Sequence, residues 1–204
     1  DVIILGAGAA GLFCASTAAK RGRRVLVLEK ANKIGKKILM SGGGRCNFTN
    51  QFVEADNFIS DNPHFCKSAL STYTQWDFID LVEQHHIEYE ERKHGQLFCV
   101  HSAKDIVAML KTECELSGVE IKTHCEVNNV ASSESDARGN NYRLEIAQGE
   151  SEPRATLAIS CHSLVIASGA LSVPTLGGSG IGYEIAKQFK LEVTDLRSGL
   201  VPFM

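Results

Sequence analysis

The sequence predicts an α/β protein with a doubly wound parallel sheet, covering helices and one antiparallel β-meander inserted before the last strand. Two buried apolar runs, at residues 1–5 and 24–29, flank an alanine-rich helix expected over 9–22, which is the order of a β-α-β unit. Between 119 and 162 the chain alternates apolar and polar residues, as antiparallel strands do. A further apolar run at 163–167 is expected to return beside the first strand.

The remaining elements follow from hydrophobic periodicity and end signals. Helices are expected at 63–73, 75–86, 103–117 and about 182–190. Ser102 is expected to cap the third of these, and Gly118 to end it. In the second, four apolar residues at helical spacing are interpreted as core: Trp76, Ile79, Leu81 and Val82. The meander strands are expected over 119–131, 142–148 and 154–161.

The connection over residues 30–57 is unusually long for a compact domain and rich in glycine and lysine. Connections of that length are usually functional or disordered. We therefore expect this segment to contribute to a binding site rather than to the regular framework.

The composition is that of a globular protein. The 204 residues are 44% hydrophobic, and no apolar run approaches the roughly 18 residues that a membrane-spanning helix needs. The seven cysteines are an odd number with no Cys-x-x-Cys, which argues against a disulfide framework and a zinc site. We expect no bound metal and a reducing, cytoplasmic location.

Positive charge is concentrated in residues 20–45. This segment holds nine basic residues and one acid, Glu29, in a chain whose net charge is −3. A solvated basic face is the general explanation of such a run. Nucleic-acid binding would call for interleaved aromatic residues, and 20–45 contains none. We therefore expect a bound anion such as a pyrophosphate, with no nucleic acid and no membrane as partner; the oligomeric state is left open.

A glycine-rich turn, Gly6-Ala7-Gly8-Ala9-Ala10-Gly11, joins the first expected strand to the first helix. In a dinucleotide fingerprint the first glycine permits the turn, the second admits a pyrophosphate and the third allows close helix packing. The helix N-terminus offers N–H groups to the phosphates, and an acid ending the second strand accepts from ribose hydroxyls. The cofactor contacts expected here are Gly6, Gly8, Ala9, Ala10, Gly11 and Glu29. The motif alone does not separate NAD from FAD.

The loop over residues 35–50 favours FAD. FAD extends beyond its pyrophosphate through a ribityl chain to the isoalloxazine ring, and polar donors in this loop could line that path. Three basic residues of the loop are expected to offset phosphate charge: Lys36, Lys37 and Arg45. The other contacts expected from the loop are Ser41, Gly42, Gly43, Cys46, Asn47 and Thr49. The segment after the returning strand is expected to pass close to the pyrophosphate: Ala167, Ser168 and Gly169. A packing role is expected for the Cys46 thiol, because the next cysteine, Cys66, is 20 residues away.

Residues 2–50 and 164–183 closely resemble the BaiN/YhiN-like family of FAD-dependent oxidoreductases, also labelled the aminoacetone oxidase family. The fingerprint and Glu29-Lys30 match, and the most specific match is Lys37-Ile38-Leu39-Met40-Ser41-Gly42-Gly43-Gly44-Arg45-Cys46-Asn47. The resemblance implies a glutathione-reductase-like, Rossmann-like FAD-binding domain. It also implies cofactor contacts from Lys30 and from the backbone near Val127, the latter against adenine.

The resemblance also implies a domain organisation. Residues 1–192 are expected to form the FAD-binding domain, with the meander at about 119–162. Family members are longer, so residues 193–204 are expected to begin a second domain that is otherwise absent. The absent part is expected to complete the isoalloxazine site, and the chain alone is expected to be inactive.

The first functional hypothesis is an FAD-dependent oxidoreductase that transfers hydride between its flavin and a small-molecule substrate. NAD(P)H as electron donor is implied by the resemblance alone. A non-catalytic flavin- or nucleotide-binding module and an NAD-dependent dehydrogenase are the alternatives. No residue is assigned as catalytic acid or base, because a fold does not fix its chemistry.

Overall fold

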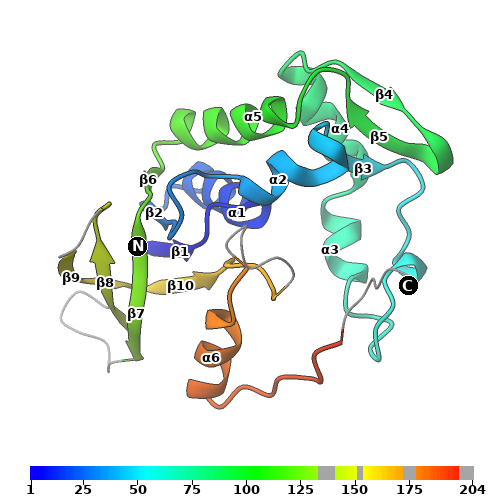
Figure 1. The fold of residues 1–204 in the computed structure, drawn as a ribbon. Helices are drawn as coiled ribbons and strands as arrows, with labels where there is room; N and C mark the ends of the chain where they lie inside the picture. The colour runs from blue at the N-terminus through cyan, green and yellow to red at the C-terminus, as the bar shows by residue number, and fades with distance from the viewer. Residues whose placement is uncertain (133–140, 151–153, 172–177, 198–204) are drawn as a thin grey trace.

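A four-stranded parallel sheet of order β10-β1-β2-β6 forms the centre of the computed structural model, which describes residues 1–132, 141–150, 154–171 and 178–197 (Figure 1). Its strands are β1 (Val2–Leu5), β2 (Val25–Leu28), β6 (Glu120–Lys122) and β10 (Ser163–Ile166). Because β1 pairs with β2 on one side and β10 on the other, the strand order reverses between β1 and β10. The doubly wound α/β class is thereby confirmed.

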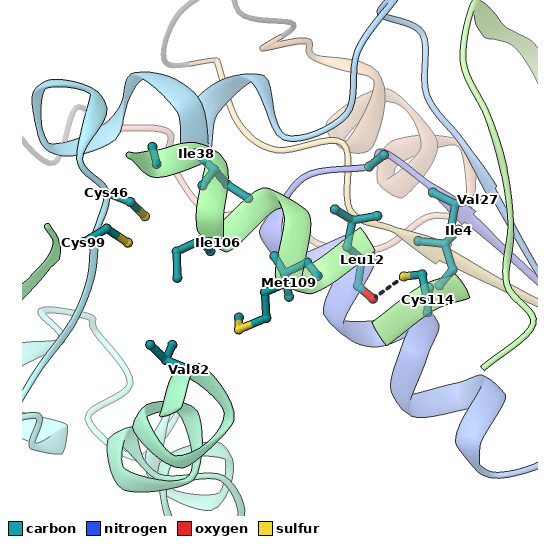
Figure 2. Close-up of a cluster of buried hydrophobic side chains, with 14 of the residues drawn as sticks. Ile4, Leu12, Val27, Ile38, Cys46, Val82, Cys99, Ile106, Met109 and Cys114 are labelled. Atoms are coloured by element: carbon teal, nitrogen blue, oxygen red, sulfur yellow. Dashed lines mark hydrogen bonds between the residues drawn. The ribbon is translucent and has the colours of Figure 1, made fainter. Parts of the chain in front are cut away.

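Successive side chains of β1 point into two different hydrophobic clusters, one on each face of the sheet. Ile4 packs in the first cluster with helices α1 (Ala9–Lys20) and α5 (Ala103–Leu116). Figure 2 shows this cluster, in which the Cys114 thiol of α5 donates to the Leu12 carbonyl oxygen of α1 over 3.3 Å. Ile3 and Leu5 pack in the second cluster with α6 (Ile181–Gln188) and the meander.

The meander consists of β7 (Cys125–Ser132), β8 (Tyr142–Gln148) and β9 (Ala155–Cys161), paired antiparallel in that order. The single strand expected over 119–131 is wrong, because this run forms two strands in different sheets. β6 pairs with β2 in the parallel sheet, and the chain turns at His124, whose φ is 54°, before β7 begins. The alternation of apolar and polar residues continues through the turn, so the pattern could not mark the break.

A second antiparallel sheet of order β3-β5-β4 was not predicted. Its strands are β3 (Asn47–Asn50), β4 (Tyr89–Glu91) and β5 (Gln96–Cys99). The expected connection over 30–57 therefore contains β3, the short helix α2 (Lys36–Met40) and 3₁₀ turns at Ser41–Gly44 and Ala55–Asn57; a third turn is Lys93–Gly95. β3 is stabilised by pairing with the distant β5, for which the local sequence carries no signal.

The helices lie close to their expected positions. The 63–73 and 75–86 segments contain α3 (Lys67–Thr72) and α4 (Gln75–Gln84). Ser102 caps α5, since its hydroxyl accepts from the Lys104 amide while Asp105 accepts from the Ser102 amide. Ile79 and Val82 are buried as expected, but Trp76 is 54% exposed, so its assignment to the core is wrong.

Within the described ranges, no helix is both long and apolar enough to cross a membrane. The same part of the chain contains no group of three His, Cys, Asp or Glu residues able to hold a metal ion. Of the residues expected to begin a second domain, 198–204 lie outside the described residues, and that expectation stays a prediction.

Candidate functional site

The glycine-rich turn between β1 and α1 lies against the segment that follows β10. Gly6 has φ 104°, and a Cβ there would stand 2.5 Å from the Ala167 carbonyl oxygen. A Cβ at Gly11 would stand 1.9 Å from the Gly6 carbonyl oxygen. Glycine at position 6 therefore admits the segment after β10, and glycine at position 11 lets α1 approach the turn. A Cβ at Gly8 would meet no heavy atom within 4 Å, and no side chain caps α1. The first N–H groups of α1 are therefore open to an anionic ligand.

Glu29 fixes this turn through its side chain. One carboxylate oxygen accepts from the Ala7 amide and the other from the Ala31 amide, each over 2.8 Å. Each oxygen can accept a further hydrogen bond, because an ionised carboxylate has about four acceptor positions. The geometry is compatible with the expected ribose contact, which stays a prediction.

A cavity of about 490 Å³, the first cavity, lies at the carboxyl ends of β1, β2 and β10. This is the crevice at which doubly wound sheets bind their ligands. The predicted residues that line it are Gly6, Gly8, Ala9, Ala10, Glu29, Lys30, Lys36, Lys37, Val127, Ala167, Ser168 and Gly169. Residues that line it but were not expected include Lys33, Glu126, Gly180 and Glu184.

The lysines that line the first cavity differ in whether they form ion pairs. Lys30 forms an ion pair with Glu126, which also pairs with Arg154 at 2.8 Å. The hydrogen bond from Lys30 lowers the pKa of the Glu126 carboxyl. By contrast, Lys33 and Lys36 form no ion pair with another described residue. Lys33 and Lys36 are therefore better placed than Lys30 to neutralise a phosphate.

Ser168 carries a buried polar atom that the fold leaves unsatisfied. Its hydroxyl oxygen has no hydrogen-bond partner within the described residues. Leaving such a group unpaired costs on the order of 1–3 kcal/mol, so native proteins rarely do so without a ligand, ion or water to satisfy it. Because Ser168 lines the first cavity, a polar ligand bound there could supply the missing partner.

A second cavity, of about 600 Å³, adjoins the first and shares Ala9, Ala10, Lys37 and Ile38 with it. The predicted residues in its wall are Ala9, Ala10, Lys37, Ser41, Cys46, Asn47 and Thr49. Four aromatic residues of its wall were not predicted: Phe13, Phe48, Tyr73 and Phe78. They come from three separate segments and form edge contacts, with the Phe13 and Tyr73 ring centres 4.8 Å apart. Only the tertiary structure brings them together.

Gly11, Gly42, Gly43 and Arg45 are not among the residues that line these two cavities. A Cβ at Gly42 would stand 2.7 Å from the Phe98 ring and 2.8 Å from the Asn47 amide nitrogen, so Gly42 packs the loop onto β5. The Arg45 guanidinium lies 3.7 Å from the Glu90 carboxylate. A direct cofactor contact from these residues stays a prediction.

Cys46, the residue before β3, and Cys99, the last residue of β5, lie next to each other in Figure 2. This proximity was not apparent from the sequence, where the next cysteine after Cys46 is Cys66. Burial raises the pKa of the Cys46 thiol and raises that of Cys99 to about 12. Both thiols are therefore protonated near neutral pH, which suits packing better than nucleophilic chemistry.

Comparison with known proteins matches residues 1–203 to the HI0933-like protein Rossmann domain. The "Ribosomal RNA dihydrouridine synthase" of Escherichia coli (strain K12) is 51% identical over 203 residues, which cover 100% of this chain and 48% of that protein. The protein of the same name from Haemophilus influenzae is 47% identical over 201 residues, covering 98% and 48%. The chain thus spans about half the length of the curated relatives it matches.

Among solved structures, the 3-ketosteroid-delta4-(5alpha)-dehydrogenase of Rhodococcus jostii RHA1 superimposes with a TM-score of 0.60 and 15% sequence identity. The match covers 84% of this chain and 46% of that chain. At this identity the similarity shows the fold alone.

The names of the two bacterial relatives contradict the expectation that nucleic acid is not a partner. That expectation depended on the lack of aromatic residues within 20–45. The fold instead brings Phe48, Tyr73 and Phe78 from other segments to the cavity that Lys37 lines.

Since the family match extends over nearly the whole chain, this protein belongs to the HI0933-like family, as its resemblance to BaiN/YhiN-like proteins implied.

Proposed function

We propose that this chain is the FAD-binding part of a flavin-dependent oxidoreductase that reduces uridine to dihydrouridine in ribosomal RNA. The observation that carries the proposal is the 51% identity, sustained over the whole chain, to a relative of that name. Because the chain spans 48% of that relative, the proposal concerns the whole protein to which this cofactor site would belong.

The residues of the first cavity fit FAD. The open backbone at Gly8 and the free N-terminus of α1 would hold the pyrophosphate, with Lys33 and Lys36 offsetting its charge. The unsatisfied Ser168 hydroxyl would gain a hydrogen-bond partner from the bound cofactor. Glu29 would accept from the adenosine ribose, and Val127 would pack against adenine. Bound FAD would supply a carrier that accepts and donates hydride.

The second cavity suits an unpaired pyrimidine base brought next to the flavin. Enzymes that modify a base in folded nucleic acid must take it out of its stack, and unpaired bases are commonly held on aromatic side chains. Tyr73 lines the cavity and is 37% exposed. Phe52 and Trp76, 65% and 54% exposed, each adjoin a lining residue, Val53 and Gln75 respectively. These aromatics support RNA rather than a small molecule as the substrate.

A nicotinamide cofactor, NADH or NADPH, is the electron donor we propose. Saturating the C5–C6 double bond of uridine consumes one hydride and one proton, and the nicotinamide is oxidised by loss of that hydride. Support for this donor comes from the family resemblance.

The test uses the full-length protein, reconstituted with FAD, and unmodified transcripts of ribosomal RNA. With NADH or NADPH present, nucleoside mass spectrometry is expected to detect dihydrouridine in a ribosomal transcript. A transfer RNA transcript and free uridine serve as controls and are expected to remain unmodified. A protein that purifies colourless and cannot be reconstituted would contradict the cofactor assignment. Flavin bleaching by NAD(P)H in stopped flow, without any dihydrouridine, would leave an oxidoreductase and refute the RNA substrate.

A further inference from the structure

Lys37 occupies the junction between the two cavities. Four residues line both cavities, and the other three, Ala9, Ala10 and Ile38, carry no charge. The remaining lysines of the basic segment that line the first cavity, Lys30, Lys33 and Lys36, are not among the residues that line the second. Lys37 thus places a positive charge of this segment where the two cavities meet.

The backbone that carries Lys37 is anchored at several points. The Gly35 amide donates to the Ala7 carbonyl oxygen over 2.8 Å, which ties the start of α2 to the fingerprint turn. A Cβ at Gly35 would stand 2.7 Å from the Val107 side chain, so α2 lies directly against α5. Ile38, the next residue, is buried in the first hydrophobic cluster. The direction in which Lys37 leaves α2 is therefore fixed by packing.

The far end of the Lys37 side chain is also positioned. Its ammonium donates to the Ala170 carbonyl oxygen over 3.3 Å, joining the loop after β2 to the segment after β10. A Cβ at Gly169 would stand only 3.0 Å from the Lys37 amine nitrogen. The absence of a side chain at Gly169 thus leaves the space that the ammonium occupies. Lys37 is partly buried and both ends of its side chain are positioned, so its charge acts from a defined place.

We infer that Lys37 raises the reduction potential of the bound flavin, acting on the redox ring rather than on the pyrophosphate. The inference rests on the proposed function, and it adds that the flavin ring of FAD bound in the first cavity reaches the entrance of the adjoining second cavity. When FAD accepts hydride from NADH or NADPH, the nicotinamide becomes NAD(P)⁺ and the flavin ring gains a net negative charge. An ammonium at the entrance to the ring's cavity stabilises that charged form more than the neutral oxidised form.

The test compares Lys37 with its neighbour Lys36, which lines the first cavity only. Full-length FAD-loaded protein is reduced at equilibrium beside a reference dye, and the affinity for oxidised FAD is measured separately by fluorescence. Lys37→Met and Lys37→Gln are both expected to lower the ratio of reduced to oxidised FAD affinity about tenfold, which is about 30 mV for a two-electron couple. Lys37→Arg, which keeps the charge, is expected to restore the wild-type potential. Lys36→Met is expected to weaken FAD binding at an unchanged potential.

Unchanged potentials in both neutral Lys37 variants, with weaker binding of oxidised FAD, would assign Lys37 to the pyrophosphate and overturn the inference. An equal shift in Lys36→Met would overturn it as well, because the effect would then be that of general positive charge. Failure of this inference can be told apart from failure of the proposed function. The reduction potential is measured without RNA, so it tests the role of Lys37 alone. A wild-type protein that takes up no FAD would instead contradict the proposed function.

Discussion

Replacing Glu29 by alanine is expected to destabilise the protein before any cofactor is added. The substitution removes the acceptors of two backbone N–H groups, those of Ala7 and Ala31, each now bonded over 2.8 Å. An unsatisfied buried donor costs about 1–3 kcal/mol, and since this site is partly open to water we take the lower end, a total of about 2 kcal/mol. With a urea dependence of about 2 kcal/mol per M, the unfolding midpoint of the cofactor-free protein falls by about 1 M.

The assay is urea unfolding followed by circular dichroism, with and without FAD. Loss of the hydrogen bond to the ribose is expected to weaken the free energy of FAD binding by about 1 kcal/mol. FAD affinity is therefore expected to fall about fivefold, in addition to any effect of the altered turn. Glu126→Gln is the matched control, because Glu126 lines the same cavity but pairs with Lys30 and Arg154. An unchanged urea midpoint in Glu29→Ala would refute the role in the turn, and unchanged FAD affinity would remove Glu29 from the ribose.

Gly11→Ala is expected to destabilise the cofactor-free protein by about 1–3 kcal/mol, because its Cβ would meet the Gly6 carbonyl oxygen at 1.9 Å. Gly8→Ala, whose Cβ meets nothing within 4 Å, is expected to keep its urea midpoint and lose FAD affinity; equal midpoints for the two variants would contradict this. Hydrogen bonds from Lys20 and then His85 hold the pKa of the Glu113 carboxyl below 4.5, so its stabilising effect is present at neutral pH and is lost as the pH falls through the lowered pKa. Glu113→Gln is accordingly expected to lower the unfolding free energy by about 1 kcal/mol at neutral pH and to match wild type in acid; a pH-independent difference would argue against this ion pair. Trp76→Ala is expected to weaken binding of ribosomal RNA about tenfold at unchanged FAD affinity, and equal RNA affinity would remove Trp76 from the RNA surface.

The parallel sheet and its fingerprint could be predicted because their signals are local. The apolar runs at 1–5 and 24–29 contain the largely buried strands β1 and β2. The spacing of Gly6 and Gly11 places glycine where the turn and the helix contact need it. The capping of α5 by Ser102 is local in the same way, since both partners lie within three residues. Such features depend on a few neighbouring residues and little on the rest of the fold.

The second antiparallel sheet could not be predicted, because its stability is not local. β4 is the three residues Tyr89–Glu91, two of them acidic, and β3 reads Asn-Phe-Thr-Asn, which has little of the apolar alternation of a strand. β3 pairs with β5, which lies far along the chain, whereas β4 and β5 are joined by the short turn Lys93–Gly95. The wrong prediction for Trp76 also has a tertiary cause. Ile79 and Val82 of α4 are buried in the core, whereas Thr74 and Gln75, at the start of the helix, border the second cavity. Trp76 lies at this open end of the helix and is exposed.

The unpredicted sheet explains the residues of the segment 41–50, which overlaps the motif that matches the family most specifically. Glycine is required at position 42 because the Phe98 ring and the Asn47 amide leave no space for a Cβ. At position 43 a Cβ would meet no heavy atom within 4 Å, and glycine is favoured there by the backbone conformation, whose φ is 67°. Cys46 is buried against Cys99 and also has a positive φ, 48°. Three polar members, Ser41, Asn47 and Thr49, line the second cavity. The segment therefore combines two requirements: Gly42 allows the loop to pack on β5, and that packing places Ser41, Asn47 and Thr49 where a ligand of the second cavity would meet them.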